Sequence, residues 1–150
     1  MLNTLPHIGF VGLGVMGSGM CGNIVRKYNG SVYAYDINQD ALAAQVAGGA
    51  IAASSLSELA RSASIIFLSL PGGKQVTAVA DEIAQHASSG TTIVDLSTTN
   101  VDDARSVAAM LAARGIDFAD APVARTRQAA IDGTLSIMVG APDALFEKLK

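Results

Sequence analysis

Short apolar runs alternate with longer polar or alanine-rich stretches over most of the chain. The runs predict buried strands at 8–11, 32–35, 65–70, 91–96 and 115–120, with a brief extended piece at 50–53. The intervening stretches predict helices at about 17–27, 39–48, 55–60, 74–87 and 101–114. This alternation predicts an α/β domain with a doubly wound parallel sheet, a Rossmann fold.

The regular alternation ends after residue 120. Residues 121–132 are typical of a loop or short helix, and 134–139, between Gly133 and Gly140, predict another strand. Asp143 is expected to cap a final helix that contains Leu145, Phe146 and Leu149.

Three spaced glycines join the first strand to the first helix. Gly12 allows a sharp turn, Gly14 leaves the backbone bare, and Gly17 lets the helix start close to the sheet. The free N–H groups of the first helical turn then favour an anion such as a pyrophosphate. This arrangement predicts a dinucleotide site.

Asp36 directly follows the second strand. An acid at this place accepts hydrogen bonds from the adenosine ribose of a dinucleotide. The alternative is a turn or helix-cap residue, although Asn38 can cap the next helix by itself. Because like charges ~4 Å apart repel by ~4 kcal/mol at an effective dielectric of ~20, a ribose 2′-phosphate is disfavoured. We expect NAD rather than NADP.

Composition excludes several classes of protein. The net charge is −3 and no Lys or Arg run exceeds two residues, so nucleic acid is not an expected partner. No apolar run approaches the ~20 residues that span a membrane, and residues 1–6 lack a charged signal-peptide head. A lone cysteine, Cys21, cannot form an internal disulfide. We expect a cytoplasmic protein without a metal site.

The first unit closely resembles one enzyme family. Its G-L-G-x-M-G-x-x-M core, from Gly12 to Met20, followed by Asn23, is similar to the signature of the β-hydroxyacid dehydrogenases, which include 3-hydroxyisobutyrate and 6-phosphogluconate dehydrogenase. Met16, Met20 and Ile24 also share one helix face, as core residues do.

The resemblance implies roles for further residues. It implies that Leu13, Val15 and Met16 join the three glycines in cofactor binding. The Leu-Pro loop, here Leu70 and Pro71, packs on the adenosine half of the cofactor in this family. The D-x-S-T turn approaches the nicotinamide ribose, with Thr98 as the matching contact. The alternatives are an ordinary strand-to-helix turn at Pro71 and a helix N-cap at Asn100.

One segment departs from the family pattern. The family's D-A-P-V-S-G-G reads Asp120-Ala121-Pro122-Val123-Ala124-Arg125-Thr126 here, so a backbone cradle is replaced by a cation. A similar segment in sulfolactaldehyde reductases binds the substrate sulfonate through its arginine. Arg125 and Thr126 are therefore expected to bind the anion of a small acid. A solvated arginine, or Arg127 in the same role, is the alternative.

No general acid is evident in the chain. His7 and His86 are expected to be packing or surface residues, and Lys74 lies at a helix start. The resemblance implies that a lysine from a following all-helical domain, absent here, moves the proton and that the oligomer forms through that domain. We therefore expect residues 1–150 to be the cofactor-binding domain of a longer, oligomeric dehydrogenase. The resemblance implies that the whole enzyme transfers hydride between a nicotinamide and a small 3-hydroxy acid or its semialdehyde, with a carboxylate or sulfonate group, and we expect this domain to bind cofactor without turning over substrate.

Two other functions are compatible with a glycine-rich turn. The first is a regulatory domain that senses NAD(H) without chemistry, which needs no loop such as 120–126. The second is a methyltransferase, although three glycines before a long helix suit a pyrophosphate better.

Overall fold

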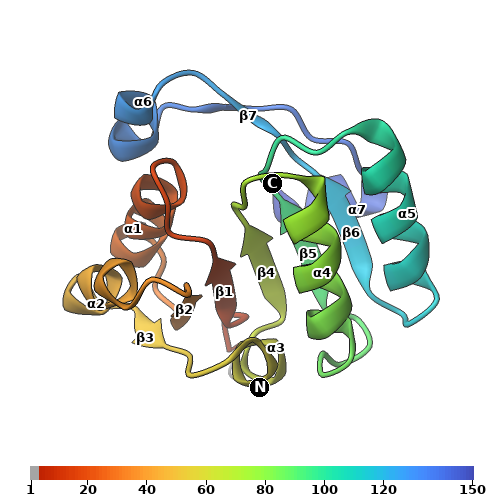
Figure 1. The fold of residues 1–150 in the computed structure, drawn as a ribbon, viewed down its shortest axis with the longest axis horizontal. Helices are drawn as coiled ribbons and strands as arrows, with labels where there is room; N and C mark the ends of the chain where they lie inside the picture. The colour runs from red at the N-terminus through yellow and green to blue at the C-terminus, as the bar shows by residue number, and fades with distance from the viewer. Residues whose placement is uncertain (1–3) are drawn as a thin grey trace.

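The central element is a six-stranded parallel sheet. The computed structural model describes residues 4–150 (Figure 1). In spatial order the strands are β3 (Ile51–Ala52), β2 (Val32–Tyr35), β1 (Ile8–Val11), β4 (Ile65–Leu68), β5 (Thr92–Asp95) and β6 (Asp117–Asp120). This order reverses direction between β1 and β4, which is the switch point of a Rossmann fold. The predicted doubly wound sheet is confirmed.

Helices cover both faces of the sheet. They are α1 (Gly17–Lys27), α2 (Gln39–Ala47), α3 (Leu56–Ser62), α4 (Gly73–Ala84), α5 (Val101–Ala112), α6 (Arg127–Asp132) and α7 (Asp143–Leu149). On one face α3, α4 and α5 bury a core that includes Leu59, Val76, Ile83, Leu111 and Ile66. On the other face α1, α2, α6 and α7 bury a second core that includes Met20, Cys21, Leu42, Leu145 and Phe10.

Side-chain caps fix where several helices begin. The Asn38 Oδ1 atom accepts hydrogen bonds from the N–H groups of Asp40 and Ala41 at the start of α2. Ser55 caps α3, and Asn100 caps α5 by accepting from the Asp103 N–H at 2.8 Å. These polar residues satisfy backbone donors that have no partner within the helix. The predicted cap at Asn100 is confirmed.

Two sequence predictions near the end of the chain differ from the structure. The strand predicted at 134–139 is present but shorter: among the described residues only Ser136–Ile137 forms a strand, β8, because it pairs there with the two-residue β7 (Val123–Ala124). Asp143 does not cap α7; Pro142 holds the cap position, and Asp143 lies in the first turn. A carboxylate there still interacts favourably with the positive end of the helix.

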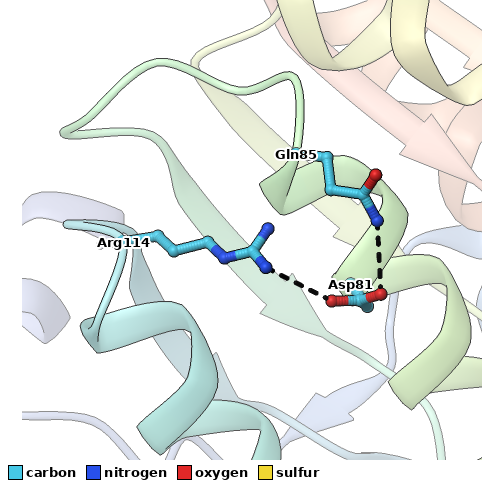
Figure 2. A network of polar contacts seen from close by, with 3 residues as sticks. All are labelled: Asp81, Gln85 and Arg114. Atoms are coloured by element: carbon cyan, nitrogen blue, oxygen red, sulfur yellow. Dashed lines mark hydrogen bonds and ion pairs between the residues drawn. The ribbon is translucent and has the colours of Figure 1, made fainter.

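A polar contact on the surface joins α4 to the turn after α5 (Figure 2). The Arg114 Nη2 atom lies 3.7 Å from the Asp81 Oδ1 atom, and the Gln85 Nε2 atom donates to the Asp81 Oδ2 atom at 3.3 Å. Both charged side chains are more than two-fifths exposed. Such pairs contribute at most ~1 kcal/mol, so the buried core does most to hold these helices together.

The expectation about a signal peptide at residues 1–6 falls partly on residues 1–3, outside the described residues. Within residues 4–150, the helices are all too short or too polar to cross a membrane.

Candidate functional site

The glycine-rich turn lies at the carboxyl end of β1, where the three glycines have different surroundings. Gly12 adopts φ +97°, and a Cβ there would lie 2.0 Å from the Ser69 carbonyl oxygen. A Cβ on Gly17 would lie 2.0 Å from the Gly12 carbonyl oxygen, so α1 starts directly against the turn. A Cβ on Gly14 would meet no described atom within 4 Å. The turn therefore needs Gly12 and Gly17 for its own shape, whereas Gly14 faces open space.

Asp36 is bonded to this turn. Its Oδ2 atom accepts from the Leu13 N–H at 2.6 Å, and its Oδ1 atom accepts from the Asn38 N–H at 2.7 Å. Since Asn38 caps α2, Asp36 is not the helix cap, but it does support the turn between β2 and α2. Each carboxylate oxygen has a further lone pair with which to accept a hydroxyl.

A groove of about 940 Å³ runs from the turn along α4. Of the predicted cofactor residues it is lined by Gly12, Gly14, Val15, Met16, Gly17, Asp36, Leu70 and Pro71. Leu13 is buried and is not among the groove-lining residues, but its backbone N–H donates to Asp36, which does line the groove. Thr98, Arg125 and Thr126 lie outside this groove. Eight of the ten predicted cofactor residues thus share one cavity.

The groove suits a dinucleotide in shape and chemistry. Val15 and Ile37 are exposed apolar side chains on its wall, and Glu82 and Asp36 are its acidic residues. Among the described residues, no side chain caps the amino end of α1 and no acid lies in its first turn. An anion at this helix end is therefore favoured by the helix dipole and meets no competing carboxylate in that turn.

The loop that follows β5 is organised by the buried carboxylate of Asp95. Asp95 accepts from the Ser97 N–H at 2.9 Å and from the Thr99 hydroxyl at 2.6 Å. The Ser97 hydroxyl oxygen in turn accepts from the Leu70 N–H at 2.8 Å. These bonds tie the Leu-Pro loop to the D-x-S-T turn and leave Thr98 exposed at its apex.

Asp120 lies beside Asp95 in the sheet register. Among the described residues, its Oδ1 atom is buried without a hydrogen-bond partner. Burial, and secondarily the neighbouring Asp95 carboxylate, raise the pKa of the Asp120 carboxyl above its ordinary value. Two carboxyl groups therefore lie side by side at the carboxyl ends of β5 and β6.

Arg125 has a backbone conformation that arginine rarely adopts. Its φ is +101°, the one positive value among the described non-glycine residues. The side chain is exposed, and its Nε atom donates to the Ser136 hydroxyl oxygen at 3.2 Å. Thr126 caps α6, its hydroxyl oxygen accepting from the Ala129 N–H at 3.3 Å. The guanidinium retains four further N–H groups with which to bind an anion.

The two histidines have structural contacts. His7 Nδ1 lies 3.2 Å from the Ser62 carbonyl oxygen, and its ring centroid lies 5.8 Å from that of Tyr33. His86 Nδ1 lies 3.2 Å from Arg61 Nη1 on the surface. His7 also lines a second cavity, of about 480 Å³, near the start of β1 and β2, away from the glycine-rich turn. Among residues 4–150 no three His, Cys, Asp or Glu side chains are grouped to bind a metal.

Sequence reasoning missed the part played by Asn23. The side chain projects from α1 onto the last turn of α6 and bonds three backbone carbonyl groups. Asn23 belongs to the motif that carried the family resemblance, but the motif does not indicate which groups its side chain contacts.

Residues 7–150 match the model of the NAD binding domain of 6-phosphogluconate dehydrogenase. The chain belongs to this family. Its cofactor is NAD, and the expected likeness to the β-hydroxyacid dehydrogenases is confirmed. The match favours the dehydrogenase prediction over the sensor and methyltransferase alternatives.

Individual relatives agree with this assignment. The chain is 40% identical over 146 residues to 2-(hydroxymethyl)glutarate dehydrogenase of Eubacterium barkeri, covering 95% of this chain and 48% of that protein. It is 32% identical over 139 residues to 3-sulfolactaldehyde reductase of Escherichia coli, covering 91% and 46%. A structure of Mycobacterium tuberculosis 3-hydroxyisobutyrate dehydrogenase with L-serine superposes with a TM-score of 0.93 at 30% identity, covering 98% and 50%. The chain spans about half the length of these relatives.

Proposed function

We propose that this chain is the cofactor-binding domain of an enzyme that transfers hydride between NAD(H) and a small 3-hydroxy acid or its semialdehyde. One observation carries the proposal: the groove beside Asp36 and the loop bearing Arg125 both follow carboxyl ends of strands in one sheet. Open α/β sheets bind their ligands at this edge.

The residues around the groove have distinct tasks in this proposal. The turn from Gly12 to Gly17 and the start of α1 bind the pyrophosphate, and Asp36 accepts the ribose hydroxyls. Leu70 and Pro71 pack on the adenosine, and Thr98 contacts the nicotinamide ribose. When bound, the nicotinamide ring gives or takes the hydride, and this domain orients it.

The loop at Arg125 selects the substrate in this proposal. A guanidinium binds a sulfonate or carboxylate through paired charge-assisted hydrogen bonds, and Thr126 adds a polar contact. The 3-sulfolactaldehyde reductase relative supports a sulfonate, and the two hydroxyacid dehydrogenase relatives support a carboxylate.

The proton is moved by a residue outside this chain. His7 and His86 are engaged elsewhere, and we assign the general acid to a lysine of a following all-helical domain. In this proposal that domain also forms a homo-oligomer, and the enzyme acts in the cytoplasm without a nucleic-acid or membrane partner.

Calorimetric titration of the 150-residue chain with NADH and NADPH tests the cofactor half of the proposal. We expect NADH to bind at least about tenfold more tightly than NADPH, because the 2′-phosphate meets the Asp36 carboxylate. Asp36→Ala is expected to remove this preference. Equal binding of both dinucleotides by the wild-type chain would contradict the assignment of Asp36.

A further inference from the structure

The short helix α6 is held on α1, outside the sheet. Figure 1 shows the segment from β7 to α6 leaving β6 and reaching over to the amino-terminal half of the domain. The two helices approach closely, because a Cβ on Gly19 would lie 2.9 Å from the Ala130 carbonyl carbon. Ala129 and Ala130 are buried in this contact region.

Asn23 makes the polar part of this contact. Its Nδ2 atom donates to the carbonyl oxygens of Ala130 at 2.7 Å, Ile131 at 3.1 Å and Gly19 at 3.1 Å. The Arg26 Nη2 atom donates to the Asn23 Oδ1 atom at 2.9 Å, which fixes the orientation of the amide. The Ala130 and Ile131 carbonyl groups lie in the last turn of α6, where no helical N–H group reaches them. Asn23 thus caps the carboxyl end of α6 from another helix.

The amino end of α6 carries the proposed anion-binding residues. Thr126 is its N-cap, and Arg125 directly precedes it. A helix of six residues is not stable by itself in water. The position of Arg125 therefore depends on the docking of α6 on α1, and the amino end of α1, at Gly17, lines the dinucleotide groove.

We propose that Asn23 is a positioning residue for substrate binding, holding the anion-binding loop 124–126 in a fixed place relative to the cofactor turn 12–17. The assignment of loop 124–126 as the part that binds the substrate anion rests on the proposed function. The positioning itself rests on the two α6 carbonyl groups that Asn23 bonds, those of Ala130 and Ile131.

Asn23→Asp tests the proposal, because a carboxylate keeps the shape and the Arg26 contact but donates no hydrogen bond. Amide hydrogen exchange of the 150-residue chain is expected to become about tenfold faster or more within 124–133 and to stay unchanged in β1, β4 and β5. The affinity for NADH is expected to stay within about twofold, because Asn23 does not line the groove. The matched control is Asn29→Asp, an exposed change that touches no part of α6.

A second readout separates positioning from general support of the fold. With NADH bound, titration with 2-hydroxyethanesulfonate followed at the Arg125 Nε–H signal is expected to show binding about tenfold weaker in Asn23→Asp. Gly19→Ala, which forces α6 away by a different route, is expected to give the same local exchange pattern.

Unchanged exchange in 124–133, or exchange that rises equally throughout the domain, would overturn the positioning role. Absence of NADH or anion binding by the wild-type chain would instead count against the proposed function.

Discussion

The Oδ2 atom of Asp36 and the backbone N–H of Leu13 are joined by a hydrogen bond of 2.6 Å. Asp36, which is expected to recognise the ribose, therefore also stabilises the turn 12–17, which is expected to bind the pyrophosphate. Loss of cofactor binding in an Asp36 variant could then arise from a missing contact or from a displaced turn.

Stability measurements on Asp36→Asn separate these causes. The amide oxygen replaces one acceptor, but the charge that strengthens both bonds is lost. We expect the free energy of unfolding to fall by about 1 kcal/mol in urea denaturation. Asp117→Asn, an exposed change at the start of β6, is the control. An unchanged midpoint in Asp36→Asn would show that the bond between Asp36 and Leu13 contributes nothing to stability.

Gly14→Ala is expected to affect binding without affecting folding. A Cβ at Gly14 meets no described atom within 4 Å, so the free energy of unfolding should change by less than about 0.5 kcal/mol. The added methyl group projects where the pyrophosphate must approach, so the NADH affinity is expected to fall about tenfold or more.

Gly12→Ala provides the contrast, because its Cβ would lie 2.0 Å from the Ser69 carbonyl oxygen. The free energy of unfolding of that variant, measured by thermal unfolding, is expected to fall by about 4 kcal/mol. Equal stabilities of the two variants would contradict this division of roles.

Arg125→Gly is expected to stabilise the chain. A non-glycine residue at φ +101° stores about 1–3 kcal/mol of strain, which glycine relieves at some cost in conformational entropy. We expect a net gain of about 1 kcal/mol in thermal unfolding, together with loss of anion binding. Arg125→Lys keeps the strain and the charge but loses the paired donors. Arg127→Ala tests whether the neighbouring arginine binds the anion instead of Arg125. A loss of stability in Arg125→Gly would argue against strain at this position.

The Asp120 carboxyl is expected to make stability fall as pH rises. Its folded-state pKa lies above the ordinary value of 3.8, so the stabilising effect is fully present below pH 3.8 and is lost as pH rises through the folded-state pKa. Relative to Asp120→Asn, the wild-type chain should therefore become less stable over this window in urea denaturation. Removing the neighbouring charge with Asp95→Asn should weaken the trend. An opposite slope would contradict the raised pKa.

The sheet and most helices could be predicted because each short buried strand has its own apolar run and turn. The segment at 134–139 could not, since most of its apolar residues face solvent in the described chain: Ile137 is 52% exposed, Met138 57% and Val139 38%. The sequence of an apolar run does not show whether that segment pairs with a sheet or lies on the surface.

Residues of the candidate site could be predicted where a local motif requires one residue type at one position. Gly12 and Asp36 follow from a backbone turn and an acid at fixed places in a βαβ unit. Asn23 bonds groups 107 and 108 positions away, and no local pattern reports such a contact. The φ of Arg125 is likewise imposed by the path of the loop, which the sequence alone does not reveal.

The segment 121–139, which carries Arg125, is closed by backbone hydrogen bonds between its two ends. Asp120 and Gly140 exchange two such bonds, of 3.1 and 2.7 Å, and the Met138 N–H donates to the Pro122 carbonyl oxygen at 3.0 Å. Because these bonds hold both ends together, changing the length of the segment costs little in loop entropy and leaves β6 in place. Under the proposed function, loop 124–126 is therefore the part of this segment in which substrate preference can change while β6, the nucleotide groove and the contact between α6 and α1 are kept.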